Sequence, residues 1–139
     1  MGKTLLSYFR GFSPDEVAEF YIQAKEPKNA EVSNSYYRVT DQDALKSVFG
    51  KKVGTAFRVE QSRPETDSSL TGAVESIRQY GRKRNAFIYT ARNAVWRLAN
   101  WKTDELISWL RDFDPDVIFF MAGDYGFMYR ITLDIQEMR

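Results

Sequence analysis

The residues best placed to do chemistry are Gly123, Asp124 and Tyr125, which follow an apolar run over residues 117–122. This run is too short for a helix and is rich in β-branched and aromatic residues, so it predicts a strand buried on both faces, as in a parallel sheet. Open α/β sheets bind ligands at the carboxyl ends of such strands. Asp124 is therefore a candidate ligand-binding residue, and its use as the N-cap of the following helix is an equal alternative.

A second candidate is the turn formed by Gly2, Lys3 and Thr4 at the head of an expected helix. Backbone N–H groups at a helix start bind anions, and Gly-Lys-Thr is also the end of a phosphate-binding P-loop. The earlier glycine and the preceding strand of that motif are missing from this sequence. We therefore expect helix initiation or a weaker anion-binding turn instead of an ATP site.

The composition narrows the chemistry further, because the chain has no cysteine and no histidine. It lacks thiolate nucleophiles as well as the commonest metal ligand and general base, so any reaction must use carboxylates, lysine, tyrosine or backbone groups. We predict no metal and no cofactor. Hydrophobic residues make up 43% of the sequence and the net charge is +1, which predicts one packed domain without a global attraction to nucleic acid.

Positive charge is concentrated in one stretch, because residues 77–102 contain no acidic residue. A basic helix over 82–97 could contact a nucleic-acid backbone. No interleaved aromatic reading motif accompanies it, so a solvated helix face is the favoured interpretation.

Periodicity and capping signals predict an α/β pattern with few strands. Residues 51–69 are expected to be a flexible excursion. The expected strands cover 19–23, 36–39 and 117–122, and the expected helices cover 5–12, 13–18, 40–49, 70–81, 83–99, 103–113 and 125–139.

Three blocks of sequence carry a family resemblance through their order and spacing. They are Gly2 to Leu5; Ile22 to Gly50, with Glu26-Pro27, Tyr36 to Asp41 and Leu45 to Gly50; and Trp101 to Thr103 through Pro115 to Phe120 and Gly123-Asp124. Together they resemble the N-terminal, acceptor-side domain of bacterial glycosyltransferases of the two-Rossmann-domain (GT-B) architecture, glycosyl transferase group 1 type. The resemblance covers most of the chain outside residues 51–80.

This resemblance implies a Rossmann-like three-layer domain with a short parallel sheet that lacks its first strand. Residues 1–139 would then be one partial domain of a larger protein, whose C-terminal domain holds a nucleotide-sugar donor. The acceptor would be a saccharide, a lipid-linked molecule or a protein. Residues 2–4 and 123–125 would face the cleft between the domains, and the chain alone is expected to be inactive.

Two other functions stay open, namely a non-catalytic α/β binding or regulatory module and a nucleic-acid binder. A flavodoxin-like receiver would need an acidic cluster, for which only Asp124 is suitably placed. The apolar runs are too short to span a membrane and the N-terminus lacks a signal-peptide core, so a cytoplasmic protein is expected. A peripheral membrane contact and a contact between copies of the chain also stay open.

Overall fold

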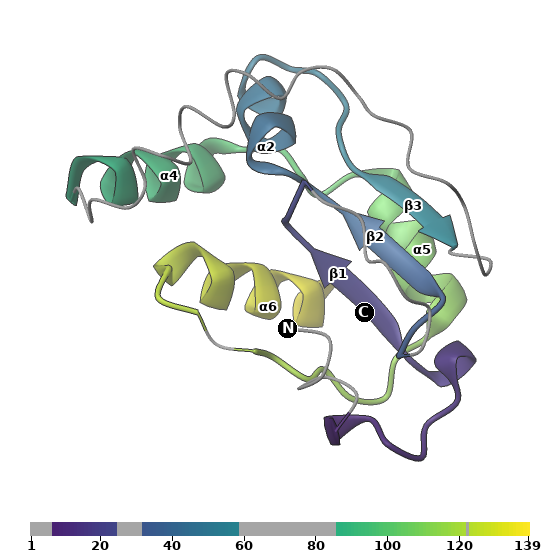
Figure 1. Ribbon diagram of the computed structural model, residues 1–139. Coiled ribbons are helices and arrows are strands. Elements are labelled where there is room, and N and C mark those ends of the chain that lie inside the picture. Colours follow the sequence, from purple (N-terminus) through teal and green to yellow (C-terminus); the bar gives the residue numbers. More distant parts are fainter. Residues whose placement is uncertain (1–6, 25–31, 59–85, 122) are drawn as a thin grey trace.

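A computed structural model describes residues 7–24, 32–58, 86–121 and 123–139. In these ranges the chain combines a three-stranded sheet with helices, which confirms the expected α/β class (Figure 1). No helix there has the length and apolar character needed to cross a membrane. The elements are η1 (Pro14–Glu16), β1 (Ala18–Tyr21), β2 (Ser35–Arg38), α2 (Asp41–Val48), β3 (Thr55–Arg58), α4 (Ala86–Leu98), α5 (Asp104–Phe113) and α6 (Gly126–Met138).

The sheet is mixed, with strand order β1-β2-β3. β1 and β2 run parallel, as expected, whereas β3 pairs with β2 in the antiparallel direction. β3 lies inside residues 51–69, where we expected a flexible excursion. The alternation of Val53, Thr55 and Phe57 is the signal for this strand, and residues 59–69 lie outside the described part of the chain.

The strand expected over residues 117–122 is not formed, and that prediction was wrong. Residues 117–121 belong to no strand, and residue 122 lies outside the described ranges. The side chains of Val117 and Phe119 are 81% and 50% exposed, while Ile118 packs partly against the core. A strand needs a neighbour that takes its backbone N–H and C=O groups, and an apolar composition alone does not supply one.

Capping side chains explain where two of the predicted helices begin. The Thr40 hydroxyl accepts the Asp43 N–H at 3.2 Å, and the Asp43 carboxylate accepts the Thr40 N–H at 3.0 Å, so α2 opens on a capping box. The Thr103 hydroxyl accepts the Leu106 N–H at 3.3 Å at the start of α5. The helices predicted over 40–49, 103–113 and 125–139 are thus confirmed to within a few residues.

The remaining predicted helices are confirmed less completely. The helix expected over 83–99 is α4, whose described part begins at Ala86. The helix expected over 13–18 is the short 3₁₀ helix η1, and of residues 5–12 only 7 and 8 are helical within the described chain. The helix expected over 70–81 lies outside the described residues.

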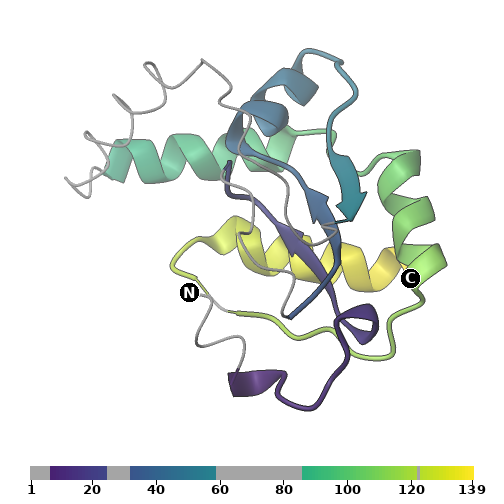
Figure 2. The same cartoon turned by 45° about the vertical axis from the view of Figure 1, so that its right-hand side comes forward.

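One face of the sheet forms the core together with the helices. α5 and α6 lie beside the sheet, and α2 and α4 lie toward the carboxyl ends of β1 and β2 (Figure 2). Because burial of this apolar surface is the main favourable term in folding, the core fixes the helices against the sheet. Its buried side chains are Tyr37, Val39, Ala44, Trp96, Trp101, Leu106, Leu110, Phe127, Ile131 and Ile135.

Tyr37 on the central strand contacts most of the elements around it. Its ring lies 6.1 Å from Phe20 of β1 and 5.5 Å from Trp109 of α5, measured between ring centroids. Its hydroxyl shares a 2.9 Å hydrogen bond with the hydroxyl of Thr103, the N-cap of α5. Gly54, just before β3, lies directly against the same ring.

Gly54→Ala should therefore destabilise the fold strongly. A methyl group at Gly54 would lie 2.8 Å from two carbons of the Tyr37 ring and closer still to its hydroxyl, and Gly54 has a φ of +97°. Gly50→Ala is the matched control, because φ there is +78° but no atom lies within 4 Å of the added methyl. Both variants carry the backbone strain, and we expect Gly54→Ala to lower the free energy of unfolding by about 1–3 kcal/mol more in urea titrations. Equal losses in the two variants would contradict the packing of Tyr37 against Gly54.

Candidate functional site

Only one of the two sets of site residues predicted from the sequence lies in the described part of the structure. Gly2, Lys3 and Thr4 lie outside the described residues. Gly123, Asp124 and Tyr125 form the loop that enters α6.

Asp124 does not cap α6. The helix begins at Gly126, and Tyr125 occupies the N-cap position. The Tyr125 side chain makes no capping hydrogen bond. The amide oxygen of Asn93, on α4, accepts the Phe127 N–H at 3.2 Å instead. The capping alternative for Asp124 is therefore excluded, and its exposed side chain lies at the surface of the loop.

The ring of Tyr125 packs between residues of α4. Tyr89 stacks on it with 4.8 Å between ring centroids and 16° between ring planes. The guanidinium carbon of Arg92 lies 4.3 Å from the Tyr125 centroid, a cation–π contact. The Tyr89 hydroxyl also donates a hydrogen bond to the backbone carbonyl of Asp124. These contacts hold the loop against α4.

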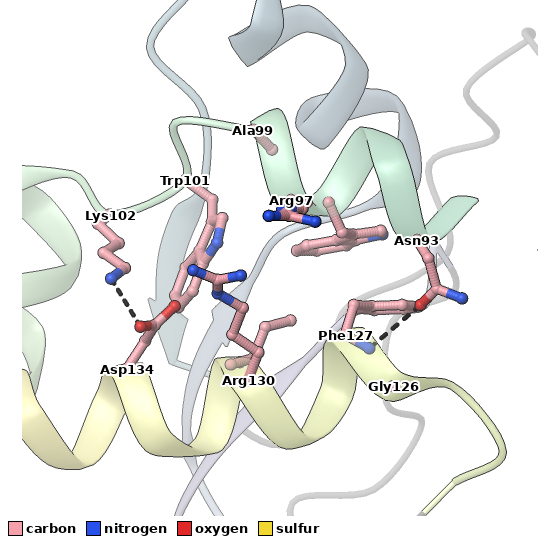
Figure 3. A pocket seen from close by; sticks show the side chains of 11 residues that line it. Asn93, Arg97, Ala99, Trp101, Lys102, Gly126, Phe127, Arg130 and Asp134 are labelled. Carbon is pink, nitrogen blue, oxygen red and sulfur yellow. Dashed lines mark hydrogen bonds and ion pairs between the residues drawn. The ribbon is translucent and has the colours of Figure 1, made fainter. Parts of the chain in front are cut away.

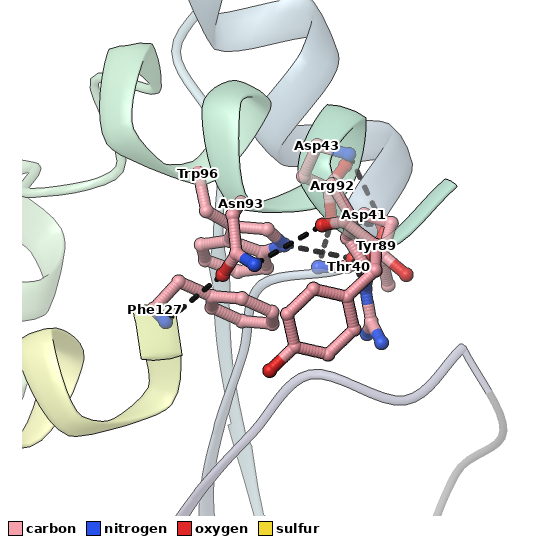
Figure 4. A network of polar contacts seen from close by, with 8 residues as sticks. All are labelled: Thr40, Asp41, Asp43, Tyr89, Arg92, Asn93, Trp96 and Phe127. Atoms are coloured by element: carbon pink, nitrogen blue, oxygen red, sulfur yellow. Dashed lines mark hydrogen bonds and ion pairs between the residues drawn. The ribbon is translucent and has the colours of Figure 1, made fainter. Parts of the chain in front are cut away.

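Arg92 joins this loop to the carboxyl end of β2, because it contacts both the Tyr125 ring and Asp41. Figure 4 shows Arg92 beside Asp41. Its Nε donates to Asp41 at 2.9 Å, and the indole Nε1 of Trp96 donates to the same carboxylate oxygen at 2.7 Å. Asp41 is the first residue of α2, only three positions after the last residue of β2. The loop thus reaches the carboxyl end of the parallel strand pair, where α/β sheets hold ligands, although residues 117–121 before it form no strand.

We name the group of Asp41, Tyr89, Arg92, Asp124 and Tyr125 the Tyr125 platform. The Asp41 side chain is 52% exposed and that of Arg92 is 25% exposed, so the platform is open to solvent. Tyr89 is an exposed aromatic residue. The platform offers carboxylate acceptors beside aromatic rings, an arrangement suited to a neutral ligand with hydroxyl groups and an apolar face.

The structure also revises the expected basic helix over 82–97. Arg92 is directed to Asp41 and to the Tyr125 ring, so this charge is compensated within the fold. Arg97, on the same helix, is exposed. The described part of α4 therefore presents less outward positive charge than the sequence indicates. No group of three or more acidic side chains suited to a metal ion occurs among the described residues.

Sequence reasoning missed Asp41 and Tyr89 as members of this site. The spacing of Tyr89, Arg92 and Trp96 puts them on one face of α4, and this face was a detectable signal. The place of Asp41 directly after Thr40 indicates only an acidic residue in the first turn of the helix expected over 40–49. Its role as an acceptor for α4 depends on contacts with Arg92 and Trp96, which lie 51 and 55 positions further along the chain. No local pattern encodes such contacts.

A second polar feature lies on the sheet face opposite Tyr37. Glu19 of β1 is the register partner of Tyr36 of β2, and successive strand residues point to opposite faces. Burial raises the pKa of the Glu19 carboxyl above 4.5. Burial and the neighbouring Glu19 charge raise the pKa of Tyr36 to about 12, against the opposing effect of its hydrogen bond to Ser33.

Comparisons of this chain with protein-family models, with curated proteins and with solved structures identified no match. The interpretation of the Tyr125 platform therefore rests on its own geometry and on the sequence blocks described above.

The raised pKa of Glu19 predicts how the free energy of unfolding changes with pH. Because the folded state holds the Glu19 proton more tightly than the unfolded state does, the free energy of unfolding should fall as pH rises from about 4.5 through the folded pKa. Glu19→Gln should remove this fall, raise the melting temperature at pH 7 and lower the pKa of Tyr36. Thermal melts across pH and absorbance titration of tyrosine measure these effects.

Glu137→Gln is the control for Glu19→Gln, because Glu137 is an exposed residue of α6. It should leave both the pH dependence and the Tyr36 titration unchanged. A Glu19→Gln protein that melts at a lower temperature than the wild type at pH 7 would contradict the effect of burial on Glu19.

Proposed function

We propose that this chain is the acceptor-binding half of a glycosyltransferase that transfers a sugar from a nucleotide-sugar donor. The acceptor, a saccharide or a molecule that carries one, binds at the Tyr125 platform. The proposal includes a Rossmann-like fold and a cytoplasmic location. It is supported by the ordered sequence blocks and by the α/β class of the fold.

The single observation that carries the proposal is the position of the Tyr125 loop. Arg92 joins it to Asp41, immediately after the parallel strand β2. Substrates of open α/β domains bind at this end of the sheet. Parallel strands such as β1 and β2, and a strand followed directly by a helix such as β2 and α2, also occur in Rossmann-like domains, which supports the proposed fold.

The chemistry of the platform fits a sugar acceptor. A pyranose has hydroxyl groups around its rim and C–H groups on its faces. The carboxylates of Asp41 and Asp124 would accept hydrogen bonds from the hydroxyls, and the rings of Tyr89 and Tyr125 would contact the apolar face. Asp41 is already held in place by Arg92 and Trp96, so little freedom is lost when a ligand binds to it.

In this function the chain positions the acceptor and leaves the donor to another domain. Orientation of two reactants is a large part of catalysis, because it makes their reaction effectively unimolecular. The part played by the residues of this chain is to hold the acceptor hydroxyl in one place. No general base is assigned among them.

The proposal is tested by measuring carbohydrate binding to the purified chain. We expect a glycan array to identify a retained glycan, and calorimetry to show saturable binding of that glycan. Asp124→Asn should raise its Kd by about tenfold or more, because a hydrogen bond to a charged acceptor contributes about 1.5–3 kcal/mol. The melting temperature should hardly change, because Asp124 is exposed.

Asp112→Asn is the matched control, since Asp112 is an exposed carboxylate on α5 and lies outside the platform. It should bind the glycan as the wild type does. Equal affinities of the two variants, or no glycan retained on the array, would contradict the proposal. Oligonucleotide retention that falls steeply with salt would favour the nucleic-acid alternative instead.

A further inference from the structure

A separate pocket lies between α4 and α6, and none of the five platform residues lines it. Its volume is about 280 Å³, and its walls come from α4, from the connection that follows it and from α6 (Figure 3). This size is near the lower end of the roughly 300–1,000 Å³ of small-molecule sites. The pocket is therefore suited to a compact organic ligand and larger than a bare ion requires.

Three cationic side chains line this pocket against one carboxylate. Lys102 and Asp134 neutralise each other, with 2.8 Å between Nζ and Oδ1. Arg97 from α4 and Arg130 from α6 are exposed, and within the described part of the chain neither has an ion-pair partner. The pocket thus carries two uncompensated positive charges, one on each wall.

The two guanidinium groups converge on the same space. Figure 3 shows Arg97 and Arg130 extending from facing helices toward the region in front of Trp101. Guanidinium groups hold phosphate through two parallel N–H···O bonds and stay charged at any physiological pH. Two of them match the charge of a phosphate monoester, which is about −1.5 to −2 at pH 7.

Apart from Asn93, the rest of the lining is apolar, which indicates what else the ligand carries. Trp101 and Ile131 are 3% and 6% exposed, so they form a closed floor, and the methyl side chain of Ala99 adds to the same apolar wall.

We propose that this pocket binds a phosphate monoester with a small organic body, such as a mononucleotide or a sugar phosphate. The phosphate lies between Arg97 and Arg130, and the body rests on Trp101 and Ile131. The inference is independent of the proposed glycan site, because each is measured with its own ligand and its own variants.

The test is calorimetric titration of the full chain with inorganic phosphate, glucose 6-phosphate and AMP. We expect saturable binding of at least one ester, tighter than that of inorganic phosphate. Arg97→Gln and Arg130→Gln should each raise the Kd of that ester by about tenfold or more, because each removes charge-assisted hydrogen bonds. Both side chains are exposed, so both variants should keep the wild-type melting temperature.

Arg111→Gln is the control of equal charge, since Arg111 is an exposed residue of α5 that does not line the pocket. It should leave the Kd of the ester unchanged within about twofold, apart from weak long-range screening effects. Three results would overturn the proposal: no saturable binding of either ester up to about 10 mM, equal weakening by all three substitutions, or no weakening by Arg97→Gln and Arg130→Gln.

Discussion

The buried side chain of Tyr37 is the constraint on which the arrangement of the other elements depends. It is fully buried on the central strand, between Phe20 of β1 and Trp109 of α5. A buried hydroxyl without a partner would be costly, and the hydroxyl of Thr103 supplies that partner. Because Thr103 also caps α5, the same contact sets where this helix begins relative to the sheet.

Local signals in the sequence were enough to predict the elements that depend on local chemistry. The helices expected over 40–49 and 103–113 begin at Thr40 and Thr103, because a hydroxyl before an acidic first turn is a capping signal contained within four residues. The strand over 117–122 failed for the opposite reason, since its apolar composition does not reveal whether another strand lies beside it. β3 was missed because its alternation is short and continues into polar residues.

The candidate site was only partly predictable. The Tyr125 loop was identified from the sequence, but for a reason the structure does not support, because the described residues before it, 117–121, form no strand that would lead it to the edge of the sheet. α4 does so instead, through Arg92 and the Asn93 cap on α6. Such contacts join segments more than 30 positions apart, and a single sequence carries no direct record of them.

The three tryptophans lie at three different junctions of the fold. The Trp96 indole donates to Asp41 between α4 and α2, and the Trp109 indole donates to Ser35 between α5 and the sheet at 3.0 Å. Trp101 lies in the connection between α4 and α5 and faces α6 across the pocket. Intrinsic fluorescence of this protein is therefore a sum of three local reporters. Replacing two of the indoles at a time would separate the loosening of the helices around α4 from the loss of the sheet itself.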